Sequence, residues 1–266
     1  NRPETYFGAY YQNPYWVLAN NKTTNNVDRF NTNITLDYKP LKWLTVTGRF
    51  GSDVYSDSRF QRWRKYSFDN QGFAKELPGR YGEDIYRVNQ INGDVIIRGS
   101  HTFKDKYSLN VILGGNLFSH NVKNTFAQTS GLAVDDLYTF ENSQDRPILL
   151  NTVYNKRMGS VYFDASFGYD NFFFFGVSGR NDWSSTLPKD KNSYFYAGLN
   201  TSLVLSELIK ADPMALSYWK IRASFAQTGK DAEPYSLRNV FISANIGDGY
   251  EQSEIRSPFV SADGSN

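Results

Sequence analysis

The sequence of 266 residues contains no cysteine and only two histidines, His101 and His120. The first absence excludes disulfides, thiolate metal sites and cysteine nucleophiles, and the second argues against a zinc site or a Ser/His/Asp triad. No apolar run approaches the ~18 residues that a membrane-spanning helix requires. Neither sign of charge is in excess, because 29 Lys and Arg stand against 27 Asp and Glu. We therefore expect no nucleic-acid partner.

Aromatic residues, in contrast, are abundant: 20 Phe, 19 Tyr and 5 Trp make up 17% of the chain. The hydrophobic share of 40% is large enough to exclude a chain too polar to fold. The mean hydropathy of −0.55 is low, but the strands of a membrane β-barrel alternate and score as polar on average. The composition therefore fits either a membrane β-barrel or a soluble β protein.

Apolar and polar residues alternate along much of the chain, and helical periodicity is scarce. Alternation with a period of two predicts β-strands that bury one face. We expect four hairpins, which pair Phe30–Tyr38 with Leu44–Val54, Gln90–Phe103 with Tyr107–Phe118, Met158–Phe167 with Phe172–Trp183, and Tyr194–Leu205 with Trp219–Thr228. The predicted fold class is all-β, an antiparallel β-barrel segment with about eight strands.

The connections between these strands are of two kinds. Three hairpins turn within a few residues, at Lys39–Lys42, Lys104–Lys106 and Tyr169–Asn171, and the fourth leaves room for one helical turn at Glu207–Lys210. The links between hairpins are longer, and they span Tyr55–Asn89, Ala127–Tyr154 and Ser184–Ser193. Gly229–Asn266 is a polar loop with no predicted partner strand. Short periplasmic turns and long extracellular loops are the plan of an outer-membrane β-barrel.

Successive strand residues point to opposite faces, so each predicted strand has an apolar set and a polar set of alternate positions, here called its apolar and polar parity. Every charged residue within the predicted strands lies on the polar parity of its strand. These residues are Asp37, Arg49, Asp53, Asp94, Arg98, Asp164, Arg180, Asp182, Lys220 and Arg222. An Arg or Lys facing lipid near the bilayer midplane costs ~2–4 kcal/mol, so a barrel would exclude it there. The predicted lumen-lining residues are Arg49, Asp53, Asp94, Arg98, Arg180 and Asp182. A soluble β-sandwich also alternates, so this pattern leaves both folds open.

Aromatic residues gather beside the short turns, which favours the barrel. The set comprises Tyr38, Trp43, Phe103, Tyr107, Tyr169, Phe172 and Trp219. Amphipathic rings form such a belt at the headgroup level of a membrane. The segment Leu44–Val54 also has the ~9–11 residues that a tilted membrane strand needs.

Three stretches of the chain resemble the SusC/RagA-type TonB-dependent outer-membrane transporters. Asp37–Val46 is similar to a periplasmic hairpin of that family, and Gly179–Ser185 is similar to its Arg-x-Asp-x-Ser-Ser strand end. The third stretch is Leu216–Lys230, which ends in Ala-Gln-Thr-Gly-Lys. The resemblance covers most of the chain, since the order of hairpins and the loop lengths also fit.

This resemblance implies a barrel of about 22 strands closed by an N-terminal plug. It further implies a SusD-like surface lipoprotein that delivers substrate, and TonB, which would act through N-terminal regions that have no counterpart in this sequence. The substrate would be an oligosaccharide or a peptide, and the location the cell outer membrane, with the lipid bilayer around the barrel. Residues 1–266 would then be part of one barrel domain, supplying wall and loops. A complete small barrel is the alternative.

One predicted loop carries candidate contacts for a ligand or for the SusD-like partner. Within Tyr55–Asn89 these are Arg62, Trp63, Arg64 and Tyr66, where rings suit stacking on sugars. Basic and aromatic residues together also suit single-stranded nucleic acid, but the near-zero net charge argues against it. An ordered loop without a ligand remains the other interpretation.

No catalytic constellation, cofactor motif or metal site is predicted, so the chain is not expected to be an enzyme. The adjacent acids Glu83-Asp84 and Asp135-Asp136 are expected to be solvated in loops, and a calcium site at Asp53 and Asp57 is the less favoured alternative to a polar loop. Two other functions remain open. One is a soluble β-sandwich that binds carbohydrate, and the other is a passive porin.

Overall fold

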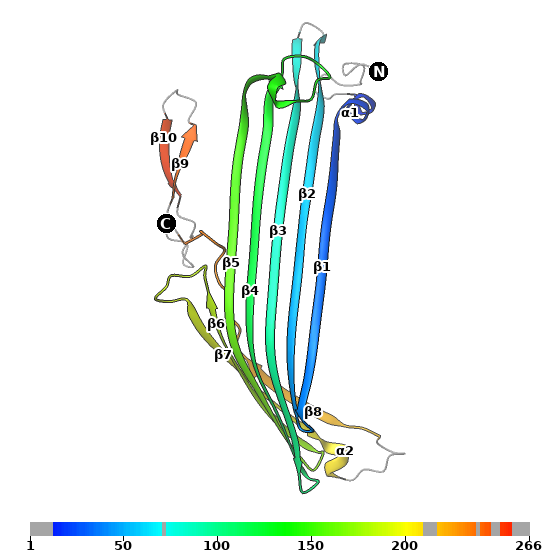
Figure 1. The fold of residues 1–266 in the computed structure, drawn as a ribbon, viewed down its shortest axis with the longest axis vertical. Helices are drawn as coiled ribbons and strands as arrows, with labels where there is room; N and C mark the ends of the chain where they lie inside the picture. The colour runs from blue at the N-terminus through cyan, green and yellow to red at the C-terminus, as the bar shows by residue number, and fades with distance from the viewer. Residues whose placement is uncertain (1–12, 71–72, 210–216, 238–239, 246–250, 257–266) are drawn as a thin grey trace. The chain divides into compact units, whose positions relative to one another are not determined.

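The computed structural model describes residues 13–70, 73–209, 217–237, 240–245 and 251–256. Eight antiparallel strands form one sheet, and each strand pairs with the next along the chain (Figure 1). They are β1 (Lys22–Leu41), β2 (Leu44–Asn70), β3 (Phe73–Phe103), β4 (Tyr107–Leu132), β5 (Ser143–Tyr169), β6 (Phe173–Ser184), β7 (Ser193–Val204) and β8 (Lys220–Ala226). The predicted fold class is confirmed.

Two of the three short turns lie where the sequence predicted them, whereas the first lies at Lys42–Trp43 because β1 continues to Leu41. Lys104 and Asp105 have φ of 49° and 53° between β3 and β4, and Asp170 and Asn171 have φ of 47° and 58° between β5 and β6. Two successive residues with positive φ make the type I′ turn, whose twist matches that of the flanking strands. Asp and Asn tolerate this conformation better than most residues, so local chemistry fixes these two turns.

The prediction that Tyr55–Asn89 is a loop is wrong, because β2 continues to Asn70 and β3 begins at Phe73. Strand pairing uses backbone groups and does not require an apolar face. Contacts between cations and rings support the pairing in this polar stretch: Arg80 lies over the ring of Trp63 at 4.3 Å, and Arg59 over that of Tyr86 at 4.9 Å.

The link Ala127–Tyr154 is also mostly strand, since β4 runs to Leu132 and β5 begins at Ser143. Between them lies a short segment that contains the 3-10 helix η1 (Phe140–Asn142). The Asn142 side chain holds this segment together, donating to the carbonyl oxygens of Val134 and Leu137, both at 2.7 Å.

Three smaller elements differ from the prediction. Helix α1 (Pro14–Asn20) was not expected; the Asn13 side chain caps it by accepting from the Tyr15 amide at 2.9 Å. The expected helical turn is α2 (Leu205–Leu208), which begins two residues earlier than predicted. The prediction of a strandless Gly229–Asn266 is wrong, because β9 (Val240–Asn245) pairs with β10 (Glu251–Arg256).

The chain forms two compact units, of which the first comprises residues 1–32, 52–90 and 121–154. The second comprises residues 33–51, 91–120 and 155–266. Among the described residues, the buried hydrophobic side chains are Trp16, Val88 and Leu132 in the first unit and Ile96 and Val204 in the second. Because these are few, hydrogen bonding between strands, rather than a packed core, holds the sheet together.

Candidate functional site

Within the second unit, the register of β5 and β6 creates two chemically different faces. On one side of the sheet Ala165 opposes Val177, and on the other Tyr162 opposes Arg180. Asp182, two residues beyond Arg180, lies on the same side as Arg180. We call these sides the apolar face and the polar face. The alternation predicted from the sequence therefore describes these strands correctly.

Arg180 and Asp182 form the centre of a hydrogen-bonded network on the polar face. Arg180 Nε donates to Asp182 Oδ1 at 2.7 Å, and its Nη2 donates to Ser160 Oγ at 2.8 Å. The guanidinium lies over the ring of Tyr162, and the hydroxyl of Tyr196 donates to the buried Asp182 carboxylate. A buried carboxylate is tolerated only with such partners. Sequence reasoning missed both tyrosines.

A second polar cluster of the same unit joins β2, β3 and β4. Arg49 Nε lies 3.7 Å from Asp94 Oδ2, and Asn116 Nδ2 donates to Asp94 Oδ1 at 2.9 Å. Arg98 Nη1 donates to the hydroxyl of the buried Thr47 at 3.0 Å. Arg49 is half exposed, so this cluster contains both satisfied groups and a cation that remains accessible to a ligand.

In the first unit, Asp53 accepts two hydrogen bonds from Arg29, at 2.8 Å from Nε and 2.5 Å from Nη2. The sequence offered no signal for Arg29, because it precedes the predicted strand. Asp57, the other residue of the proposed calcium site, accepts from Arg59 at 2.7 Å. Each of the six predicted lumen residues thus makes a polar contact within the chain, while the lumen assignment itself stays a prediction.

A third cluster, centred on Asp231, lies where two of the resembling stretches end. Asp231 Oδ1 is 2.7 Å from Lys156 Nζ, and Asp231 Oδ2 accepts from Ser184 Oγ at 2.6 Å. Thr186 Oγ1 donates to the same oxygen at 3.3 Å. We call these four residues the Asp231 cluster. It joins the end of β6 to the segment that directly follows Gly229-Lys230, a contact between motifs that sequence spacing alone does not reveal.

The electrostatics of the Asp231 cluster favour the charged carboxylate. Burial alone would raise the pKa of Asp231, but the hydrogen bonds from Lys156, Ser184 and Thr186, with the charge of Lys156, lower that pKa below its ordinary value. Beside the cluster is a cavity of about 360 Å³ that Leu187, Pro188, Pro234 and Tyr235 help to line. The site can therefore hold the 227–237 segment against the 185–192 loop.

The predicted ligand contacts in the first unit divide into two groups. Arg64 Nε donates to Asp135 Oδ2 at 2.8 Å, and the ring of Tyr66 packs against Trp16 with centroids 5.7 Å apart. These two residues therefore support the fold. Trp63 and Arg62 are exposed, and Trp63 lines a cavity of about 180 Å³. Arg62, Trp63 and Arg64 are thus all exposed, with Arg64 paired to Asp135 and Arg80 lying over the ring of Trp63.

The adjacent acids are not simply solvated, which corrects the sequence prediction. Asp135 accepts from Arg64 and from the Lys65 amide at 2.9 Å, and Asp84 accepts from Asn124 Nδ2 at 2.5 Å. Glu83 accepts from the hydroxyl of Tyr81 at 2.5 Å.

Burial, followed by the hydrogen bond to Glu83 and its charge, raises the pKa of Tyr81 to about 12, against an opposing effect from Arg62. Within the described ranges, no three His, Asp or Glu residues are grouped to hold a metal ion. No helix in the described part of the chain combines the length and apolar character needed to cross a membrane.

The comparisons with known proteins identify the fold. The chain matches no protein-family model, and none of the curated proteins matches it. Among solved structures, the RagAB peptide transporter matches with a TM-score of 0.79 at 16% identity, covering 96% of this chain and 29% of the other. The RagAB peptide importer matches with a TM-score of 0.76 in its closed-closed and open-open states, also at 16% identity. Those two alignments cover 96% and 95% of this chain and 28% of theirs. This chain thus has the fold of less than a third of a RagAB transporter chain.

Proposed function

We propose that the chain forms part of the wall of an outer-membrane transport β-barrel of SusC/RagA type. The polar face would line the lumen, and the apolar face would contact lipid. The proposal assigns a transport role and no enzymatic one. It combines the resembling stretches of sequence with the fold shared with the RagAB structures.

The exposed apolar face is the observation that carries this proposal. In the second unit Leu117, Phe225 and Val161 are 73%, 66% and 57% exposed. Soluble monomers rarely leave contiguous apolar surface of this kind in water. A β-sandwich would cover it with a second sheet, but the other sheet among the described residues has two strands. Lipid is the environment that this face suits.

The rings near the turns support the membrane assignment. Tyr107 and Tyr169 lie with their centroids 5.1 Å apart, and Tyr169 and Phe172 lie 5.3 Å apart. Trp43 and Trp219 are each 49% exposed. Rings that combine an apolar body with a polar edge suit the headgroup level of a bilayer.

The edges of the sheet favour a larger barrel. β1 and β8 are the outermost strands in the described order. Lipid cannot satisfy the unpaired backbone groups of an edge strand, and each such group costs several kcal/mol there. In the proposed barrel both edges therefore pair with strands outside this chain, and the plug would also lie outside it.

The proposed substrate and partners are inferred from the likeness to the RagAB structures and from the resembling stretches of sequence. The matched structures are described as a peptide transporter and a peptide importer. We propose that the barrel imports peptides, with oligosaccharides as the alternative. We further propose that a SusD-like lipoprotein delivers the substrate and that TonB drives its release through the plug.

Arginine substitutions on opposite faces of one strand test this proposal. Val111 lies on the apolar parity of β4, and Asn110 lies on the polar parity. Val111→Arg in the intact protein should block assembly in the outer membrane, because Arg facing lipid costs ~2–4 kcal/mol. The measurement is the amount of heat-modifiable, protease-resistant protein in outer-membrane fractions.

Asn110→Arg is the matched control and should assemble close to the level of the unsubstituted protein. The pair Phe163→Arg and Asp164→Arg repeats the comparison on β5. Equal assembly of both members of each pair would contradict the proposed orientation.

A further inference from the structure

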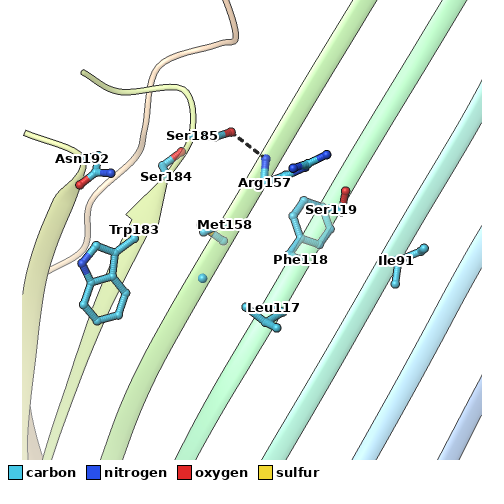
Figure 2. A pocket seen from close by; sticks show the side chains of 11 residues that line it. Ile91, Leu117, Phe118, Ser119, Arg157, Met158, Trp183, Ser184, Ser185 and Asn192 are labelled. Atoms are coloured by element: carbon cyan, nitrogen blue, oxygen red, sulfur yellow. Dashed lines mark hydrogen bonds between the residues drawn. The ribbon is translucent and has the colours of Figure 1, made fainter. Parts of the chain in front are cut away.

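Two adjoining hollows in the second unit lie where β3, β4, β5 and β6 carry apolar side chains. One has a volume of about 460 Å³ and the other about 610 Å³, and Leu117, Gly159 and Trp183 line both. Figure 2 shows the first hollow, with Leu117 on β4 and Trp183 on β6 lying on either side of β5, and with Arg157 near Ser119. Both volumes lie within the ~300–1,000 Å³ typical of ligand sites. We call the two hollows together the glycine groove.

Glycines on three successive strands create this groove. Gly93, Gly115 and Gly159 all line the second hollow. A Cβ atom at Gly93 would have no neighbour within 4 Å, and one at Gly159 would have its nearest at 3.6 Å, in Leu117. On the polar face, by contrast, a Cβ at Gly114 would collide with the ring of Tyr162. Packing therefore explains Gly114 but leaves the space above the other glycines unfilled.

The walls of the groove suit a hydrocarbon chain. Leu117 and Val95 are 73% and 58% exposed, and Trp183 is 43% exposed. Under the proposed function these residues face the bilayer. A flexible apolar ligand that fills the groove would bury them at ~25 cal/mol per Å² of apolar surface.

One end of the groove carries a single positive charge. Arg157 is the charged residue of the first hollow, alongside the polar Ser119 and Asn192. The second hollow is lined by two charged residues, Arg49 and Asp94, but these lie 3.7 Å apart as an ion pair. The Ser185 amide donates to the Arg157 carbonyl oxygen, and the Arg157 amide donates to Ser185 Oγ, both at 2.9 Å. These two hydrogen bonds fix the position of the Arg157 backbone. Its guanidinium has no acidic partner among the described residues, whereas that of Arg180 is paired. An anionic group is the chemical complement of this end.

The height of Arg157 on its strand agrees with a headgroup contact. β5 reaches the short turn at Tyr169. About 12 residues at ~3.3 Å each, tilted by ~40°, span roughly 30 Å, which is the thickness of the hydrocarbon core. If the turn lies at the inner surface, Arg157 lies at the outer one.

We propose that the glycine groove binds a bilayer lipid whose acyl chain fills the hollows and whose phosphate binds Arg157. This inference rests on the proposed membrane orientation. It adds to that orientation a specific lipid site, because the apolar groove ends at a guanidinium that has no acidic partner in the described part of the chain.

Quenching of Trp183 fluorescence by brominated acyl chains tests the site. The intact protein is placed in zwitterionic nanodiscs, and brominated phosphatidylglycerol or phosphatidylcholine is added in parallel. Subtracting the signal of Trp183→Phe isolates this tryptophan. We expect half-maximal quenching at about fivefold lower mole fraction with phosphatidylglycerol, since one basic residue contributes ~1 kcal/mol with anionic lipid. Inorganic phosphate should not substitute for the lipid.

Two variants locate the binding. Arg157→Gln should abolish the preference for phosphatidylglycerol, and Gly159→Leu should fill the groove and remove preferential quenching. The controls Lys189→Gln, in the 185–192 loop, and Ala165→Leu, elsewhere on the apolar face, should retain it. Equal quenching by both lipids in the unsubstituted protein would overturn the lipid site while leaving the membrane orientation intact. Absence of quenching by either lipid would overturn the orientation itself.

Discussion

At the scale of single residues, charge on the polar face is largely neutralised within the chain. Arg180 pairs with Asp182, Arg49 with Asp94, and Lys156 with Asp231. The first of these pairs explains why the sheet accepts the buried carboxylate of Asp182. The sequence predicted which face of each strand carries the charged residues. It did not predict which of these residues form ion pairs, because that depends on the strand register. Asp231 lay in a stretch without alternation and gave no signal of its own.

The Asp231 cluster should control the stability of the 227–237 segment. The Asp231 side chain is 9% exposed, so Asp231→Asn leaves Lys156 without its anionic partner. We expect amide hydrogen exchange in residues 227–237 to accelerate about tenfold, equivalent to ~1.4 kcal/mol of local stability. Asp190→Asn, an exposed change in the 185–192 loop, should leave this exchange unaltered. Unchanged exchange in Asp231→Asn would show that the cluster does not hold the segment.

The same cluster predicts a direction of pH dependence. The folded chain lowers the pKa of Asp231, so the unfolded chain binds more protons at acidic pH. The stabilisation should be complete above the ordinary Asp value of about 3.9 and should be lost as pH falls through the lowered pKa. Exchange measured against pH should therefore show an acid-induced loss of protection that is absent from Asp231→Asn. Identical profiles for the two proteins would contradict this assignment.

At the scale of elements, alternation predicted the sheet and turn chemistry predicted the hairpins. Asp170-Asn171 adopts the turn that these residue types favour. Alternation failed where strands lack an apolar face: β2 and β3 extend through Tyr55–Asn89 by backbone pairing, which leaves no hydrophobic period to detect. Capping by Asn13 is a local signal for α1 that hydrophobic periodicity does not contain.

Substitutions in the polar extension of β2 and β3 should distinguish residues that support the fold from residues that contact a ligand or partner. Arg62 and Arg64 are both exposed, but Arg64 donates to Asp135 at 2.8 Å within the first unit. Arg64→Gln should therefore accelerate hydrogen exchange in residues 133–142 severalfold, with about 1 kcal/mol lost for the charged hydrogen bond. Arg62→Gln should leave exchange unchanged but weaken substrate uptake or lipoprotein binding. If Arg62→Gln alters exchange as much as Arg64→Gln does, the division is wrong.

At the scale of the whole molecule, the proposed function requires that the two faces of one sheet meet different solvents. The fold matches RagAB transporter chains at low identity, and the chain spans less than a third of their length. Composition could not have placed the chain in a membrane, since alternating strands average to a polar hydropathy. The register, which sorts apolar and polar residues to opposite faces, is what supports the proposed membrane wall.

The proposed lipid-facing wall is tested most directly by spin-label accessibility along β5 in the intact protein in lipid bilayers. The chain has no cysteine to compete with labels at Phe163, Asp164, Ala165 and Ser166. Accessibility to oxygen, which concentrates in lipid, and to a water-soluble nickel complex should alternate. Phe163 and Ala165 should favour oxygen, and Asp164 and Ser166 should favour nickel. Uniform nickel accessibility at all four positions would contradict the proposed lipid-facing wall.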